Sequence, residues 1–309
     1  MTRAAEVLLR SLIDYAGTFP PAKLGLADAI RAYADHRSQV HAWMLGRFVL
    51  ASAALDEFDA VAPTFLNKAH GPWPVTIVGS RETMPDADRL ADFSREWKGR
   101  ATVMAVEFGP MKPSEIAAAA RRLPHDLDMY FEIPPGSDIQ AALEEIATSG
   151  GRAKIRTGGL TPNVFPDAMA FIGFLEACHR ARVAFKATAG LHHAVSGSYA
   201  LTDDPDSGRV NMYGFLNVAL AALLVQADDS PIEALDVLRE SSPKAFTFSN
   251  EGLLWRERII TLASLANVRR RFFKGFGSCM FSEPVEELVR LGIIEGEVSS
   301  APVSTPGVS

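Results

Sequence analysis

The sequence predicts a (β/α)8 barrel of the TIM type, formed as a single domain with an irregular C-terminal part. Short apolar runs rich in β-branched residues alternate with longer segments of helical period, which is typical of a parallel sheet built from βαβ units. No run is followed by the glycine-rich fingerprints of open nucleotide-binding sheets. Polar residues follow many of the runs instead, which favours a barrel, because barrels build active sites from the ends of many strands.

Seven runs are expected to form strands because each is short, apolar and bounded by polar or turn-forming residues. They are Ser11 to Ala16, Arg47 to Ser52, Val75 to Ser80, Thr102 to Phe108, Met129 to Ile133, Ala153 to Thr157 and Ala184 to Ala189. The eighth strand is expected either at Ala245 to Phe248 or at Phe276 to Cys279.

The segments between these runs carry helical periodicity, and several begin with the Pro, Asp or Ser that favours a helix start. They include Pro85 to Trp97, Ser114 to Leu123, Ile139 to Thr148 and Pro166 to Arg182. The region from Leu201 to Trp255 contains two helical patterns before any further strand, so we expect an insertion or an irregular last unit there. The barrel domain is expected to cover residues 1–295. Residues 296–309 are poor in large apolar side chains, and we expect a disordered tail.

The amino-acid composition of the chain argues against nucleic acid and membranes as binding partners. The chain has 309 residues, with 31 Lys and Arg against 37 Asp and Glu, so it lacks the basic surplus that drives nucleic-acid binding. Cys178 and Cys279 are its two cysteines, which excludes a disulfide framework and favours a reducing cytoplasm. The first ten residues lack the apolar core of a signal peptide, and the longest apolar stretch, Val218 to Val225, is too short to span a bilayer. We therefore expect a cytoplasmic protein that binds neither nucleic acid nor membranes.

Two neighbouring strands carry the most informative residues. Side chains alternate along a strand, so Lys154 and Arg156 point to one side while Ile155 points to the other. Helices cover the outside of a barrel, which places Ile155 outside and the two cations inside. The next strand repeats the pattern with Lys186 and Thr188, and adjacent strands lie about 4.8 Å apart. Desolvation and a neighbouring ammonium both lower a lysine pKa from about 10.4, which is how an enzyme makes lysine nucleophilic.

The pattern Lys-x-x-Thr-Gly at Lys154, Thr157 and Gly158, followed by Lys-Ala-Thr-x-Gly-Leu at Lys186 to Leu191, resembles deoxyribose-phosphate aldolase and related class I aldolases, which are (β/α)8 barrels. The resemblance covers two strands with their loops, about a quarter of the chain. It implies that Lys154 forms a Schiff base with a carbonyl substrate and that Lys186 lowers its pKa. It also implies that the glycines after these strands, Gly158, Gly159 and Gly190, help to hold a phosphate.

Other strand-end residues complete the candidate site. Glu107 and Glu132 are each expected to move protons or to balance the inward cations. Glu107 is the nearest counterpart of the proton-shuttling Asp of the aldolase family. Asp14 is expected to hold a substrate hydroxyl or to cap the turn at Gly17. The substrate-binding candidates are Asp14, Arg156, Thr157, Gly158, Gly159, Thr188, Gly190, His192 and His193.

His192 and His193 are adjacent, so on an extended backbone only one of them can face the site. Such a histidine is expected to bind substrate or a loop carbonyl. No metal-binding spacing occurs in the sequence, and the leading interpretation needs no metal and no cofactor.

Three functions fit these residues. The first is an aldolase-like lyase that acts through a Schiff base on Lys154 with a small anionic carbonyl metabolite. The second is a metal-assisted lyase or a phosphoribosyl-type transferase in which the same lysines bind phosphate or carboxylate. The third is a barrel that binds an anionic metabolite without turnover.

An aromatic cluster near the C-terminus could mark an interface between subunits or the inner face of the last barrel unit. Its members are Phe272, Phe273, Phe276, Met280 and Phe281. The first reading would make the protein a homo-oligomer.

Overall fold

The computed structural model describes residues 1–66, 71–80, 83–134, 138–201 and 207–296, and within these ranges eight parallel strands close into a barrel. The strands run in the order β1-β2-β3-β4-β5-β6-β7-β13, with β13 returning to β1. They are β1 (Ile13–Tyr15), β2 (Leu45–Ala51), β3 (Trp73–Gly79), β4 (Ala101–Phe108), β5 (Asp128–Glu132), β6 (Arg152–Arg156), β7 (Phe185–Thr188) and β13 (Phe273–Ser278). The predicted (β/α)8 fold is therefore confirmed.

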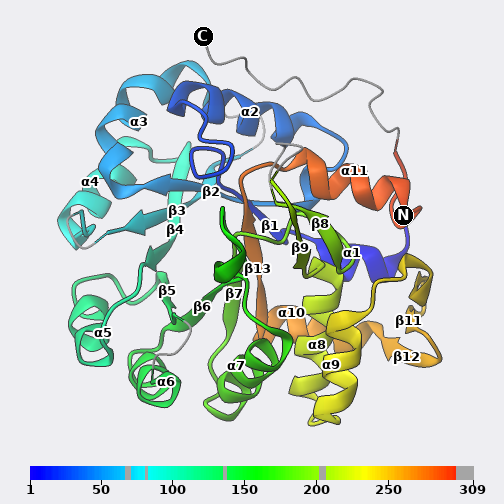
Figure 1. Ribbon diagram of the computed structural model, residues 1–309. Coiled ribbons are helices and arrows are strands. Elements are labelled where there is room, and N and C mark those ends of the chain that lie inside the picture. The colour runs from blue at the N-terminus through cyan, green and yellow to red at the C-terminus, as the bar shows by residue number, and fades with distance from the viewer. Residues whose placement is uncertain (67–70, 81–82, 135–137, 202–206, 297–309) are drawn as a thin grey trace.

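Helices surround this barrel, as Figure 1 shows. Those that follow the strands in turn are α2 (Leu26–Ser38), α3 (Leu55–Val61), α4 (Ala87–Glu96), α5 (Pro113–Ala120), α6 (Ile139–Thr148), α7 (Ala168–Arg180), α8 (Phe215–Gln226) and α11 (Ser282–Arg290). Asp86, Asp138 and Asp167 begin α4, α6 and α7 by accepting hydrogen bonds from backbone N–H groups of the first turn. These caps explain why the helix starts could be predicted to within about two residues.

The eighth strand is β13, which overlaps the predicted segment Phe276 to Cys279 over residues 276–278. The competing segment, Phe246–Phe248, forms β10 in a separate antiparallel sheet. Phe272, Phe273, Phe276 and Phe281 are each at most 3% exposed, so these four belong to the core and form no interface patch.

The region expected to be irregular contains additional elements. They are β8 (Gly197–Ala200), β9 (Arg209–Met212), α9 (Pro231–Arg239), β10 (Phe246–Phe248), β11 (Gly252–Trp255) and β12 (Arg258–Thr261), followed by α10 (Leu262–Arg271). The first helix is α1 (Arg3–Leu9), and short 3-10 turns lie at Ala42–Met44, Ser52–Ala54, Ala62–Thr64, Pro162–Val164 and Pro243–Ala245. Residues 215–225 of α8 are all buried, because α9 packs over the face that would otherwise meet solvent. The predicted disordered tail lies outside the described residues, apart from Gly296.

Charged side chains are buried in the barrel interior. Ala153 and Ile155 of β6 are buried among apolar residues of the core, whereas Lys154 between them meets carboxylates. Register places Lys154 directly beside Lys186 of β7, as the alternation of side chains predicts. The two lysines therefore lie inside the barrel, on its strands.

Candidate active site

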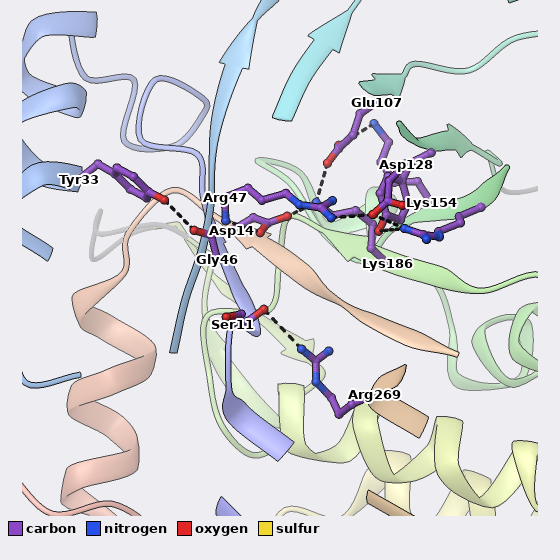
Figure 2. A network of polar contacts seen from close by, with 12 residues as sticks. Ser11, Asp14, Tyr33, Gly46, Arg47, Glu107, Asp128, Lys154, Lys186 and Arg269 are labelled. Carbon is purple, nitrogen blue, oxygen red and sulfur yellow. Dashed lines mark hydrogen bonds and ion pairs between the residues drawn. The ribbon is translucent and has the colours of Figure 1, made fainter. Parts of the chain in front are cut away.

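Five charged side chains form a continuous network across the barrel interior, and Figure 2 shows four of them, Asp14, Glu107, Lys154 and Lys186. Lys186 Nζ donates to Asp14 Oδ2 at 2.6 Å and to Glu107 Oε1 at 2.5 Å. Glu107 Oε2 in turn lies 3.3 Å from Lys154 Nζ, which also lies 3.3 Å from Glu132 Oε2. Glu107 thus joins the two lysines, one at each carboxylate oxygen. The structure brings together the four residues predicted to be catalytic and adds Asp14 to them.

Burial and charge act in opposite directions within this network. Burial alone would raise the pKa of Glu107, but the adjacent ammonium groups of Lys186 and Lys154 lower it to about 2. Burial alone would lower the pKa of Lys186, but Asp14 and Glu107 raise it above its usual value. Lys186 is therefore a permanent cation beside Lys154, and Glu107 is a permanent anion.

This balance predicts an acid-sensitive contribution to stability. Because the pKa of Glu107 is lower in the folded protein than in the unfolded chain, its ionised form stabilises the fold. The contribution is present above about pH 4.5 and is lost as the pH falls toward about 2. Its size is about 3 kcal/mol. Urea unfolding at several pH values should show the stability of wild type and of Glu107→Gln converging below pH 4.5, and a gap that stays constant with pH would contradict this assignment.

A cavity of about 510 Å³ opens where the strands end. Glu107 and Lys154 line it from inside the barrel, and Arg156, which is half exposed, lies nearer the rim. Arg156 Nε lies 3.5 Å from Glu132 Oε1, so Glu132 contacts both inward cations of β6. The predicted Gly159, Thr188, Gly190 and His192 also line the cavity. Most of the site predicted from the sequence therefore faces one space.

Four predicted substrate-binding residues have other roles. Asp14 holds Lys186 and accepts a hydrogen bond from the Arg47 backbone N–H at 2.7 Å, so it neither faces the cavity nor caps the turn at Gly17. Thr157 is fully buried, and its hydroxyl donates to the carbonyl of Ala189. The alternation of side chains along β1 correctly places Asp14 inside the barrel. It does not show how far along the barrel axis the side chain lies.

The two adjacent histidines separate as expected. His192 lines the cavity, and its Nδ1 lies 3.2 Å from Glu283 Oε2 on α11. His193 stacks on Tyr199 with ring centroids 3.4 Å apart, and its Nδ1 lies 3.5 Å from Glu287. His192 therefore faces the cavity. His193 instead contacts α11 and the β8–β9 hairpin, and it links the loop after β7 to both.

The fourth misplaced residue, Gly158, packs against Gly190. A Cβ on Gly158 would lie 2.7 Å from the Cα of Gly190, and one on Gly190 would lie 2.7 Å from the carbonyl oxygen of Thr157. Gly190 also has a φ of +75°, a conformation that side chains disfavour. Both glycines are therefore required because the loops after β6 and β7 touch through their backbones.

Replacing Gly190 with alanine should lower the free energy of unfolding by about 3 kcal/mol, the sum of a strained backbone and a steric clash. The matched control is Gly150→Ala, because Gly150 has a similar φ of +68° but open space around a Cβ. The control should lose only about 1 kcal/mol. Urea denaturation measures both, and equal losses would show that the contact between the loops is unimportant.

The sequence did not indicate the apolar wall of the cavity. Its residues come from strands β2 and β3 and from the segments after β1, β6, β7 and β13, and they include Phe19, Pro20, Pro21, Val49, Val78, Leu160, Val164, Phe165, Leu201, Met212 and Cys279. The Pro-Pro turn after β1 is a visible signal in the sequence, whereas the contribution of Met212 from β9 requires the tertiary structure.

Comparisons with known proteins add little to this description. No family model matches the chain, and no curated protein matches it. A search of solved structures finds the catalytic domain of a hyperthermophilic chitinase from Pyrococcus furiosus, with a TM-score of 0.35 and 12% identity over 59% of this chain and 74% of that chain. The (β/α)8 assignment stands on the strand topology, and the resemblance to class I aldolases stays a prediction.

Two features are absent from the described ranges: a metal-binding cluster and a membrane-spanning helix. No three His, Cys, Asp or Glu side chains there converge in a way that could hold a metal ion. No helix in those ranges has the length and apolar character needed to cross a membrane.

Proposed function

We propose that this protein is an aldolase-like lyase that forms a Schiff base between Lys154 and a small anionic carbonyl compound. The observation that carries the proposal is the position of Lys154: its side chain is 5% exposed, lines the cavity and contacts two carboxylates. Lys186 lies beside it in register but lines a different cavity, so Lys154 is the amine that a substrate can reach. This is the division of roles that the resemblance implies for the two lysines.

The network supplies the charges that imine chemistry needs. The cluster is electrically neutral, because three cations pair with three carboxylates: Lys154, Lys186 and Arg156 with Asp14, Glu107 and Glu132. An anion that enters the cavity therefore makes the net charge of the cluster negative. Arg156 and His192 at the rim are placed to bind that anion. Glu107 keeps its charge because its pKa is about 2, and it stabilises a positive charge on Lys154. Glu132 contacts Lys154 and has no contact with Lys186, so we assign proton transfer to Glu132.

The reaction follows from these roles. Lys154 loses a proton to Glu132, and its nitrogen attacks the carbonyl carbon. Glu132 returns that proton to the carbonyl oxygen, which leaves as water to give an iminium ion and restores the Glu132 carboxylate. Glu132 then removes the proton of the hydroxyl group on the β carbon. The carbon–carbon bond breaks, an aldehyde leaves, and the electron pair moves into the iminium to form an enamine. Protonation of the enamine carbon and hydrolysis of the resulting imine release the second product and restore Lys154.

One observation favours a second candidate function. In the resting structure Lys154 lies within ion-pair distance of two carboxylates, which is the geometry of a lysine that acts as a cation. A charged Lys154 would bind a phosphate or carboxylate group without forming a covalent bond. In that case the cavity belongs to a transferase, to a different lyase or to a protein that binds a metabolite without turnover.

Borohydride reduction distinguishes the two candidates. The protein is incubated with small aldehydes, ketones and 2-oxo acids, reduced, and examined by intact mass and peptide mapping, with Lys154→Ala and the exposed-site variant Lys98→Ala as controls. The proposal expects a stable adduct on Lys154 in wild type and in Lys98→Ala, and none in Lys154→Ala. Binding of these carbonyl acids without any reducible adduct would establish the second candidate and overturn the first.

A further inference from the structure

A second cavity, of about 330 Å³, lies at the opposite end of the barrel. Residues at the beginning of the strands line it, together with inward residues from the middle of the barrel. They are Ser11, Asp14, Leu45, Gly46, Arg47, Pro74, Met104, Asp128, Tyr130, Arg152, Lys186, Lys274 and Gly275. Met104 is 43% exposed although it lies on a barrel strand, so this end of the barrel is open to solvent. Residues at this end of a (β/α)8 barrel usually contribute to the stability of the fold. A cavity lined by charged side chains does not fit that role and needs another explanation.

The charges in this cavity do not balance. Asp14 is engaged by Lys186, which leaves Asp128 as the remaining carboxylate of the lining. Arg47 lies 2.6 Å from Asp128 Oδ2, and Arg152 pairs with the same oxygen. One carboxylate therefore serves two guanidinium groups from different strands.

Lys274 adds a third cation. Its ammonium donates to the main-chain carbonyl of Arg270, and it forms no ion pair with any described carboxylate. Burial, followed by the charge of Arg152, lowers its pKa to about 8. The cations of Arg47, Arg152 and Lys274 thus exceed Asp128 by two charges in a partly buried space.

A fourth cation, Arg269, lies close enough to act on Lys274 electrostatically. Its guanidinium donates to the main-chain carbonyls of Ser11 and Phe273, as Figure 2 shows for Ser11, and it has no described carboxylate partner. Its Nε is buried without a hydrogen-bond partner among the described residues. Clustered cations without counter-charges are costly to bury, and a bound anion removes that cost.

We infer that the cavity at the amino-terminal end of the barrel, formed by Arg47, Arg152 and Lys274 around Asp128, is a binding site for a small, doubly charged oxyanion of the phosphate type. Planar guanidinium groups and a lysine are the groups that proteins use to bind phosphate. Its volume accommodates either free phosphate or the phosphoryl end of a small phosphate monoester. This site is separate from the carbonyl-binding cavity and does not depend on the function proposed for it.

Calorimetric titration of the whole protein tests the inference. Inorganic phosphate and glycerol phosphate are titrated at constant ionic strength into wild type, Lys274→Met, Arg156→Met and Lys98→Met. We expect Lys274→Met to weaken phosphate binding at least about 10-fold and Lys98→Met to bind as wild type does, whereas Arg156→Met reports phosphate that binds in the other cavity. Comparable binding of both anions identifies a site that accepts monoesters, whereas binding of inorganic phosphate alone identifies a site for the free ion.

A second measurement needs no variant. Lys274 of the wild-type protein is acetylated with a limiting amount of acetic anhydride, and peptide mapping gives its modification rate with and without phosphate. Phosphate should slow modification of Lys274 at least about 5-fold while leaving that of Lys98 unchanged. The inference is overturned if phosphate does not protect Lys274, if Lys274→Met binds phosphate as wild type does, or if Arg156→Met alone abolishes binding.

Discussion

Replacing Glu107 with glutamine is expected to lower the free energy of unfolding by about 3 kcal/mol at neutral pH, among the largest losses that any single substitution in this chain should cause. Glu107 is 4% exposed and bridges Lys154 and Lys186, whose side chains are also almost fully buried. Without its charge, Lys186 retains only Asp14 and Lys154 retains only Glu132. Each of the two buried ammonium groups then has one carboxylate partner in place of two, so the cost of burying its charge is less fully offset.

Urea denaturation at pH 7 measures this effect, with Glu257→Gln as the matched control because Glu257 is exposed. The control should stay within about 0.5 kcal/mol of wild type. A loss below about 1 kcal/mol for Glu107→Gln would mean that the two lysines are neutral or solvated, and the description of the network would then be wrong.

Replacing Lys154 is expected to abolish turnover, and the identity of the replacement separates the two candidate functions. With a carbonyl substrate identified by trapping, both Lys154→Met and Lys154→Arg should reduce kcat/KM by more than about 1,000-fold. Arginine keeps the positive charge but cannot form an imine. A charge-only role predicts a different result, in which Lys154→Arg retains activity within about 10-fold of wild type while Lys154→Met loses it.

Both variants should be compared with Lys98→Met, whose exposed position leaves the cavity unchanged. Far-UV circular dichroism and urea denaturation establish that each variant is folded before its kinetics are interpreted. Retention of substrate binding by Lys154→Arg, together with loss of the reducible adduct, would separate recognition from chemistry within a single variant.

The sequence predicted the architecture well because each barrel unit carries its own local signals. Seven strands occur within two residues of their expected positions, and Asp caps mark the helix starts. The eighth strand was ambiguous because both candidate segments are short and aromatic. What decides between them is pairing with β1 and β7, which local sequence does not encode.

The candidate site was predicted less completely, for a geometric reason. Alternation along a strand gives the side of the sheet on which Lys154, Lys186 and Glu107 lie, and all three meet as expected. Alternation gives no position along the barrel axis, so Asp14 was assigned to substrate although it faces the opposite cavity. Thr157 and Gly158 follow a strand that does reach the cavity, but contacts with the loop after β7 determine their roles.

The salt bridge between Glu107 and Lys186 separates the two ends of the barrel. Glu107 lines one cavity and Lys186 lines the other, with 2.5 Å between their charged atoms. A charge that binds at either end therefore acts on the other end through a single ion pair. Thermodynamic linkage is reciprocal, so any factor by which an anion at one end changes affinity at the other must apply equally in reverse. The barrel interior thus provides a short electrostatic connection between two compartments that share no lining residue.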